Sequence, residues 1–243
     1  MKYTVNFTVN SHDTDLNGIL RPSALLKYLQ EAANLQMHTY GPDMRSLVSE
    51  QNKTFVVSRL SVNVYADLFA WDEIEVTTWA NPSPGAAFRR STQARRDGVI
   101  VAEMISVFAL IDLQTGRLCR TSDVQFGFDT DDSVLDIDEP ESFRIPADVE
   151  AALRGEHTVR YADVDYNMHM NNTVYPDVLC GFLPDIEKKR ILSFALHYMH
   201  EAKHGQTFKV YVGSDEDVSY LRTQLPGGSC GVEAIFMTED LSS

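Results

Sequence analysis

The sequence predicts an α+β fold made of two fused copies of one unit, each a helix wrapped by a curved antiparallel sheet. The first observation behind this prediction is that the chain repeats itself, segment by segment and in the same order. The second is that each copy places a helical pattern before several alternating, β-rich segments joined by turn residues. With 243 residues, 44% of them hydrophobic, the chain can bury a core in both units.

Three pairs of matched segments carry the repeat. The first pair shares the pattern Asp-x-Asp-x-Asn, at residues 13–17 and again at 163–167, an offset of 150. The other pairs are β-rich, with offsets of 134 and 130: residues 59–76 match 193–210, and residues 95–112 match 225–240. Because the order is the same in both halves, the pattern indicates a duplicated unit.

In the first copy, a short strand ends at the Asp-x-Asp-x-Asn stretch and a helix follows. The helix should begin near Pro22 or Ser23, which suit a helix N-terminus, and end about Tyr40, because Gly41-Pro42 stops it. Its buried stripe is predicted to be Leu25, Leu26, Leu29, Ala33 and Met37. Four strands should follow: Phe55–Tyr65, Glu73–Ala80, Ala87–Arg96 and Ile100–Asp112, the last two joined by a tight turn at Asp97-Gly98.

The second copy repeats this plan with a shorter helix, from about Thr173 to Phe182. Its strands are expected near 192–201, 206–213, 217–225 and 230–238, with Pro226-Gly227-Gly228 as a turn. Residues 122–152 are acidic and contain two prolines, which predicts a linker between an N-terminal unit, 1–121, and a C-terminal unit, 153–243. The linker should pack partly across both copies, to bury Phe126, Phe128, Leu135 and Ile137.

Charge and composition exclude several classes of function. The net charge of −14 argues against a nucleic-acid partner, because an acidic surface repels phosphate backbones. No apolar run approaches the roughly 18–20 residues that cross a bilayer, and no targeting pattern stands at the start, so we expect a cytoplasmic protein without membrane insertion. Cys119, Cys180 and Cys230 are odd in number and lack a Cys-x-x-Cys pair, which predicts free thiols rather than disulfides or a zinc site.

The stretch from 163 to 172, Asp-Val-Asp-Tyr-Asn-Met-His-Met-Asn-Asn, is the strongest candidate for chemistry. Polar residues alternate with apolar ones, so in an extended segment two carboxylates, one imidazole and two amides would share a face. Burying such a row is costly unless its members bond one another, which favours a site. The alternative is a polar turn before the helix, with Asn171 and Asn172 as caps and Asp163 stabilising the turn.

The first copy lacks the imidazole. It keeps both aspartates and the asparagine, but Gly18-Ile19 stands where the second copy has Met168-His169. This difference predicts a single working site, in the second copy. His12 lies nearby in the first copy, and we interpret it as a structural or solvent-facing histidine.

The row Asp-Val-Asp-Tyr-Asn-Met-His-Met-Asn-Asn, followed by a short helix, resembles the hotdog-fold thioesterases. The two-copy layout is similar to that of the acyl-acyl carrier protein thioesterases, which release free fatty acids, and the resemblance runs from about residue 3 to 238. It implies two fused hotdog units and a catalytic set of Asp165, Asn167 and His169. Glu201 matches a further acidic residue of the family, in a Tyr-x-x-Glu-Cys pattern in which Ala202 replaces the cysteine here.

The resemblance implies thioester hydrolysis, and because Ala202 is not a thiol, a cysteine mechanism is not expected. Asp165 would activate water or attack directly, with His169 orienting it and moving a proton, Asn167 holding the carbonyl or the carboxylate, and Glu201 as a second acid–base group. We expect neither a cofactor nor a metal ion, since His197 and His200 would face opposite sides of a strand. The acyl chain would lie in an apolar pocket of the N-terminal unit.

Acyl carrier protein is the expected partner, and a homodimer is a further expectation. Because carrier proteins are acidic, docking would need a basic patch, for which there are two candidates: Arg89, Arg90, Arg95 and Arg96, or Lys188, Lys189 and Arg190. Three alternative functions stay open: an acyl-CoA thioesterase, a hydratase or dehydratase acting on acyl thioesters, and an acyl-binding module without turnover.

Overall fold

The computed structural model describes residues 1–83 and 85–241. Within them, ten strands form one antiparallel sheet, in the order β1-β3-β4-β5-β2-β7-β10-β9-β8-β6. The strands of the first copy are β1 (Tyr3–Thr8), β2 (Lys53–Val64), β3 (Glu73–Ala80), β4 (Ala87–Arg96) and β5 (Val99–Asp112). Those of the second are β6 (Ala152–Thr158), β7 (Lys189–Tyr198), β8 (Thr207–Asp215), β9 (Val218–Gln224) and β10 (Cys230–Asp240).

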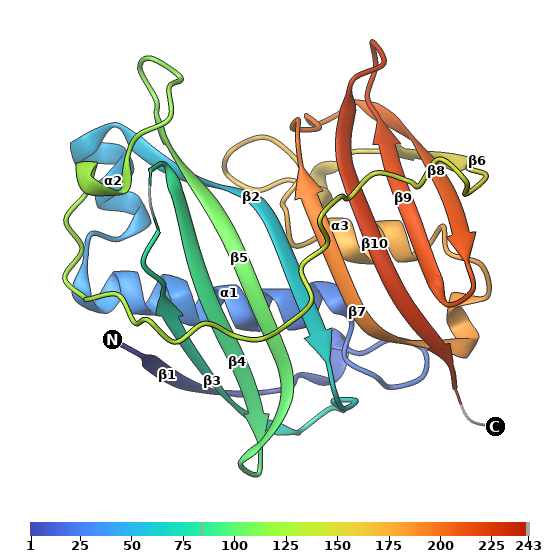
Figure 1. Ribbon diagram of the computed structural model, residues 1–243, viewed down its shortest axis with the longest axis horizontal. Helices are drawn as coiled ribbons and strands as arrows, with labels where there is room; N and C mark the ends of the chain where they lie inside the picture. The colour runs from blue at the N-terminus through green and yellow to red at the C-terminus, as the bar shows by residue number, and fades with distance from the viewer. Residues whose placement is uncertain (84, 242–243) are drawn as a thin grey trace.

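The strand order reads the same from both edges, because each copy contributes the same five-strand arrangement. The copies meet where β2 pairs with β7, from Arg59 opposite His197 to Asn63 opposite Ser193. The predicted α+β class is confirmed, and the two sheets are in addition continuous with each other. Figure 1 shows α1 (Pro22–Tyr40) and α3 (Tyr175–Cys180) behind this sheet.

The long helix α1 has the predicted bounds. Pro22 stands in its first turn, and Gly41, at φ 68°, ends it with an N–H donated to the carbonyl of Met37. All five residues of the predicted stripe are buried. The shorter helix α3 spans fewer residues than predicted, because residues 172–174 form a turn before it.

Helix α2 (Met44–Gln51) was not predicted. Its N-cap Asp43 accepts a hydrogen bond from the Ser46 N–H at 2.8 Å, and Leu47 is its one buried residue among those described. A helix with so little apolar surface leaves no periodic signal in the sequence. By contrast, the β4–β5 turn was predicted correctly: Asp97 and Gly98 have φ values of 53° and 78°, as a two-residue hairpin turn requires.

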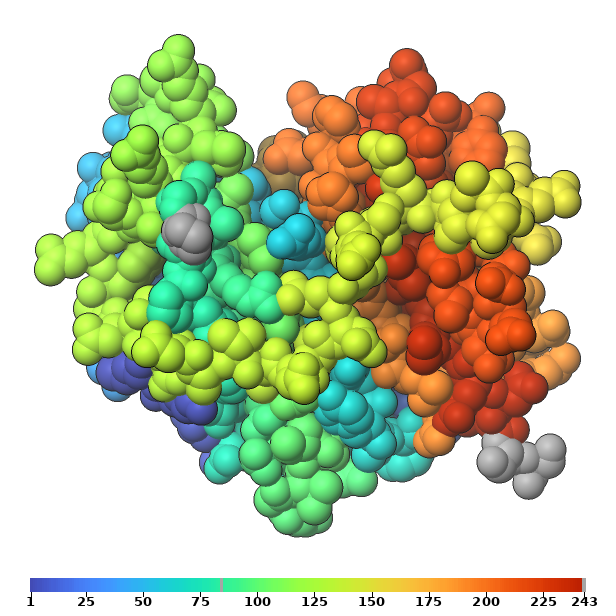
Figure 2. Space-filling model, viewed as in Figure 1, coloured from blue at the N-terminus to red at the C-terminus, as the bar shows by residue number. Residues whose placement is uncertain are grey.

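The segment 122–152 runs from the C-terminal end of α1 across the sheet face opposite the helices (Figures 1 and 2). On the first copy, the Ser133 carbonyl accepts from Trp79 Nε1 at 2.6 Å. On the second, Phe143 is buried with its ring 5.3 Å from that of His197, and Val149 contacts Gly213. The segment therefore packs against both copies.

Among the described residues, no helix combines the length and apolarity that a membrane crossing requires.

Candidate active site

Residues 161–172 fold back on themselves instead of extending. A 3-10 helix at Tyr161–Asp163 leads to a bridge between Val164 and Met170, and the Met168 N–H donates to the Asp165 carbonyl at 3.0 Å. Met168 has a φ of 67°, in the left-handed region. The prediction of an extended row with one shared polar face is therefore wrong, since side chains alternate between faces only in extended backbone.

Two residues of the row hold the loop in shape. Asp163 accepts from the Arg160 N–H at 2.8 Å and pairs with His157 Nε2 at 2.9 Å. Asn171 accepts from the backbone N–H and the hydroxyl of Thr173, at 2.9 and 2.8 Å. Asp163 and Asn171 thus have the turn-stabilising roles of the alternative interpretation.

Asp165 and Asn167 line a large cavity. Asp165 Oδ1 accepts from the Asn167 N–H at 2.8 Å, and its Oδ2 has no hydrogen-bond partner within the described chain. Asp165 is half-buried and Asn167 is exposed. One oxygen of the carboxylate therefore stabilises the turn, and the other is free to accept a hydrogen bond from a ligand or water.

His169 and Glu201 form a pair. Their Nε2 and Oε1 atoms are 3.2 Å apart, with the His169 side chain 26% exposed and that of Glu201 53% exposed. The Met170 N–H donates to the Ala202 carbonyl at 2.8 Å, which holds the loop against the segment after β7. A carboxylate at Nε2 favours a proton on that nitrogen and leaves Nδ1 as the acceptor in the neutral imidazole.

The four predicted residues thus lie on one loop and the segment beside it, as two separate pairs. In the described part of the chain, no side-chain hydrogen bond joins the His169–Glu201 pair to Asp165 or Asn167; the link is a backbone hydrogen bond from the Asp165 N–H to the His169 carbonyl, at 3.4 Å. Asp165 and Asn167 face the cavity, whereas the imidazole and Glu201 are not part of its lining.

This main cavity has a volume of about 930 Å³ and extends from the loop of the second copy into the first. Its polar end carries Asp165, Asn167, Asn171, Asn172, Gln30 and Lys27. Its apolar wall belongs to the first copy and the start of the linker: Met37, Phe55, Val57, Phe88, Phe108, Phe126 and Phe128. Volume and lining are typical of a pocket for an apolar ligand with one polar end.

Sequence reasoning missed Gln30, which lies on α1 beside the loop. Its Oε1 accepts from Asn172 Nδ2 at 3.2 Å, while its Nε2 is buried and has no partner among the described residues. A buried donor without an acceptor is costly unless a ligand supplies one. The one sequence feature that could have indicated Gln30 is its position beside Leu29, at the edge of the apolar stripe of the helix.

Arg90 was placed in a surface cluster, and that prediction is wrong. It is buried in the main cavity wall, where it donates to Gln36 Oε1 at 2.6 Å and to Thr78 Oγ1 at 3.2 Å, and lies over the Phe128 ring. Burial lowers the pKa of Arg90 to about 10, so the guanidinium stays charged at neutral pH. No carboxylate pairs with it within the described chain, so the cavity contains an uncompensated cation.

The other basic candidates are largely engaged. Arg89 pairs with Glu139 of the linker, Arg96 with Asp72, and Arg190 with Glu239 and with Asp67. His12 is exposed, as expected, and all three cysteines are free and buried. A docking surface on these clusters would have to compete with pairs that already exist.

Two family models match the chain. The acyl-ACP thioesterase N-terminal domain matches residues 1–125, and the acyl-ACP thioesterase C-terminal domain matches residues 147–226.

Curated relatives are found in plants. The chain is 26% identical over 214 residues to a chloroplastic palmitoyl-acyl carrier protein thioesterase of Arabidopsis thaliana, which covers 81% of this chain and 51% of that protein. It is 28% identical over 197 residues to a chloroplastic dodecanoyl-[acyl-carrier-protein] hydrolase of Umbellularia californica, covering 75% and 52%. The chain thus spans about half the length of the curated relatives it matches.

Solved structures share the fold over nearly the whole chain. An acyl-ACP thioesterase from Bacteroides thetaiotaomicron superposes with a TM-score of 0.86 at 22% identity, covering 98% of both chains. A 12:0-ACP thioesterase from Umbellularia californica gives 0.77 at 21% identity, covering 99% of this chain and 98% of that one. These likenesses establish the two-unit hotdog fold, and the two matched domain models show that the chain belongs to the acyl-ACP thioesterase family.

Proposed function

We propose that this chain hydrolyses fatty acyl thioesters of acyl carrier protein, releasing a fatty acid and the free thiol of the carrier. One observation supports this most: Asp165, with a free carboxylate oxygen, lies at the polar end of a large cavity, and a histidine–carboxylate pair lies on the same loop and the segment beside it. The names of the plant relatives describe the same reaction.

In the proposed reaction, the acyl chain lies in the main cavity, which brings its carbonyl carbon to Asp165 and Asn167. The Asp165 carboxylate either removes a proton from an attacking water or attacks the carbonyl itself, and both routes give a tetrahedral oxyanion. The side chains of Asn167 and Gln30 donate hydrogen bonds to that oxyanion. Such donors stabilise charge that appears only in the transition state.

Collapse of the oxyanion breaks the carbon–sulfur bond and leaves a thiolate. In the direct route it also leaves an acyl anhydride on Asp165, which a water molecule then hydrolyses to the fatty acid. We assign the proton for this thiolate to the His169 imidazolium, paired with Glu201, because the pair lies outside the cavity lining, where the thiol arm of the carrier would lie. Solvent then returns a proton to the imidazole. This division of roles agrees with the observed separation into two pairs.

The cavity wall determines which chains fit. Each methylene removed from water contributes about 0.8 kcal/mol, so affinity should rise with chain length until the chain meets the far end of the cavity. Along α1, Gln36 lies six residues beyond Gln30, roughly 9 Å at the rise of a helix. Arg90, bound to Gln36, is therefore the group that a long chain would reach.

The test compares acyl carrier protein and CoA thioesters over a range of chain lengths, quantifying free thiol and free fatty acid. We expect cleavage of carrier-protein substrates in preference to CoA substrates, and its loss in Asp165→Ala. Cleavage of CoA thioesters alone, hydration of the acyl chain, or binding without turnover would assign the chain to one of the three alternative functions.

Three further expectations belong to this proposal. Residues 1–121 and 153–243 would be separate units joined by 122–152, a division supported by the ranges of the two family models. A reducing compartment such as the cytoplasm is supported by three free, buried cysteines, and localisation of a tagged chain would test it. A homodimer is the third expectation, measured by sedimentation velocity.

A further inference from the structure

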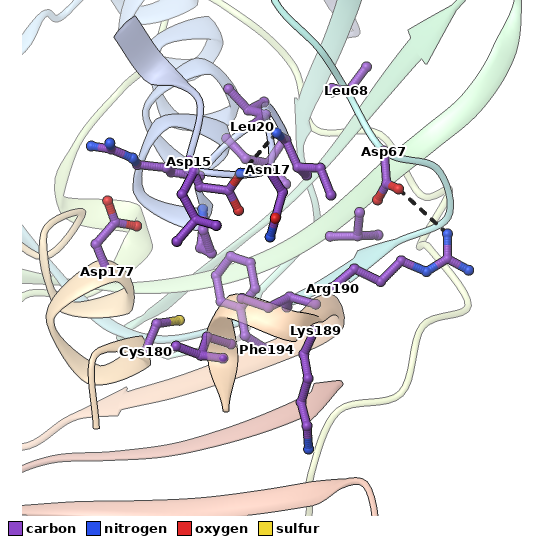
Figure 3. Close-up of a pocket in the computed structure, with 18 of the residues that line it drawn as sticks. Asp15, Asn17, Leu20, Asp67, Leu68, Asp177, Cys180, Lys189, Arg190 and Phe194 are labelled. Atoms are coloured by element: carbon purple, nitrogen blue, oxygen red, sulfur yellow. Dashed lines mark hydrogen bonds and ion pairs between the residues drawn. The ribbon is translucent and has the colours of Figure 1, made fainter. Parts of the chain in front are cut away.

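The first copy has a cavity of its own. It has a volume of about 340 Å³, lies beside the loop that carries Asp15 and Asn17, and shares no lining residue with the main cavity. Figure 3 shows Asn17 directed toward the Phe194 ring, with Asp177 and Cys180 of α3 on one side and Arg190 on the other. We call this space the second cavity.

The second cavity is the counterpart of the main cavity under the internal repeat. Its loop residues Asp15 and Asn17 correspond to Asp165 and Asn167. The same offset of 150 relates Asp177, Cys180 and Gly181 of the second cavity to Lys27, Gln30 and Glu31 of the main one, and the offset of 134 relates Lys189 and Ile191 to Phe55 and Val57. The backbone repeats too: the Leu20 N–H donates to the Leu68 carbonyl at 2.8 Å, as Met170 does to Ala202.

This counterpart cannot perform the proposed hydrolysis, because Ile19 occupies the position of His169. The bridge between Ile19 and Phe69 repeats that between His169 and Lys203. The backbone is therefore the same in both copies, and only the side chain differs. Asp67 stands at the place of Glu201, but it pairs with Arg190 at 3.6 Å. The second cavity can therefore bind a ligand without transferring a proton to it from an imidazole.

Four carboxylates, Glu187 among them, and three cations line the second cavity, and two of the cations have no ion pair in the described chain. Asp15 is bonded to the N–H groups of Asn17 and Ile19, at 2.8 and 3.0 Å, and Asp177 accepts from the Ser23 N–H and hydroxyl, at 2.9 and 2.6 Å. Lys189 and Arg21 line the cavity without an ion pair in the described chain. Figure 3 shows the Lys189 side chain extending away from Phe194, so its amine lies away from this apolar side chain.

The remaining wall of the second cavity is aliphatic and aromatic. The volume of the cavity, about 340 Å³, is within the usual range for small-molecule sites. Its apolar residues include Leu20, Leu25, Ala66, Leu68, Ile191 and Phe194. An apolar wall with two unpaired cations among the lining residues fits an aliphatic carboxylate better than an aliphatic cation.

We propose that the second cavity is a separate binding site for a free fatty acid, with its hydrocarbon chain against Phe194 and its carboxylate at Lys189. The choice of ligand rests on the proposed function, because a fatty acid is the product that the main cavity would release. The second cavity binds this molecule without changing it.

The test measures how many equivalents of decanoate bind the full chain, by equilibrium dialysis with a radiolabelled ligand. We expect two equivalents for the wild type and one for Ala66→Trp, because Ala66 lines the second cavity only and an indole there would fill it. Ala151→Trp, on an exposed residue that lines neither cavity, serves as the matched control and should keep two. One equivalent in the wild type, or two in Ala66→Trp, would overturn the proposal.

A second variant probes the carboxylate without filling the cavity. Lys189→Met should weaken the second equivalent of decanoate about tenfold, the effect of losing one charge-assisted hydrogen bond, and leave decanol binding unchanged. Equal affinities for decanoate in Lys189→Met and wild type would contradict the assigned head-group position.

The hydrolysis assay separates this proposal from the function of the main cavity. If the wild type cleaves acyl carrier protein substrates but binds only one decanoate, the proposal of the second site is refuted and the proposed hydrolysis is not. If the wild type cleaves no thioester but binds two decanoates, and Ala66→Trp binds only one, the proposed hydrolysis is refuted and the second site is supported.

Discussion

Glu201 Oε1 lies 3.2 Å from His169 Nε2, whereas Asp67, at the equivalent position of the first copy, pairs with Arg190. The duplicated scaffold therefore places an acidic residue at the same point twice and gives it an imidazole partner once. Replacing the carboxylate of the His169–Glu201 pair should lower activity without loss of the fold.

For Glu201→Gln we expect kcat to fall by about a hundredfold, because a carboxamide no longer stabilises the imidazolium that protonates the thiolate. The melting temperature should change little, since Glu201 is more than half exposed. Glu156→Gln, on an exposed residue of β6, is the matched control. Equal kcat values for the two variants would contradict the role of the pair.

Gln30 should act through its Nε2, and two substitutions separate that role from the contact with Asn172. Gln30→Glu keeps an oxygen for Asn172 but removes the donor, and Gln30→Met removes both. We expect both variants to lose about a hundredfold in kcat with little change in KM, as for other single oxyanion donors. An active Gln30→Glu would show that Gln30 only positions Asn172.

Arg90 should limit chain length. In Arg90→Met the buried charge is gone, so longer saturated chains should gain in kcat/KM by up to about fourfold per additional methylene, the equivalent of 0.8 kcal/mol. Arg95→Met, which changes a residue outside both cavity linings, is the control. A chain-length profile identical to that of the wild type would mean that acyl chains do not reach Arg90.

Met168 holds a backbone conformation that glycine adopts more easily. Its φ is 67°, and Gly18 at the equivalent position of the first copy has 79°. Met168→Gly should therefore raise the free energy of unfolding by up to about 1 kcal/mol, and Met168→Val should lower it, since a β-branched side chain is poorly tolerated there. Chemical denaturation measures both; a destabilised Met168→Gly would refute the assigned strain.

Much of the fold could be predicted from local patterns. Strands β3 and β4 have the predicted bounds because alternating residues and turn residues define them, and α1 is delimited by Pro22 and Gly41. The pairing of β2 with β7 was not predicted, since nothing in either strand indicates that its neighbour is the other copy.

The residues of the candidate site remain a prediction from the sequence, and their geometry was not predicted. The pattern of polar residues identified Asp165 and His169, yet the left-handed turn at Met168 has no sequence signal in a residue other than glycine. Gln30 was missed and Arg90 was assigned to the surface because both line a cavity that exists only once the two copies pack together.

The most direct measurement is the release of free thiol from acyl carrier protein thioesters by His169→Ala and His12→Ala. His169 lies on the loop of the second copy and pairs with Glu201, whereas His12 lies before the equivalent loop of the first copy and faces solvent. We expect His169→Ala to lose at least about a hundredfold in kcat and His12→Ala to match the wild type. Wild-type rates from His169→Ala, or an equal loss in both variants, would contradict a single hydrolytic site on the loop of the second copy.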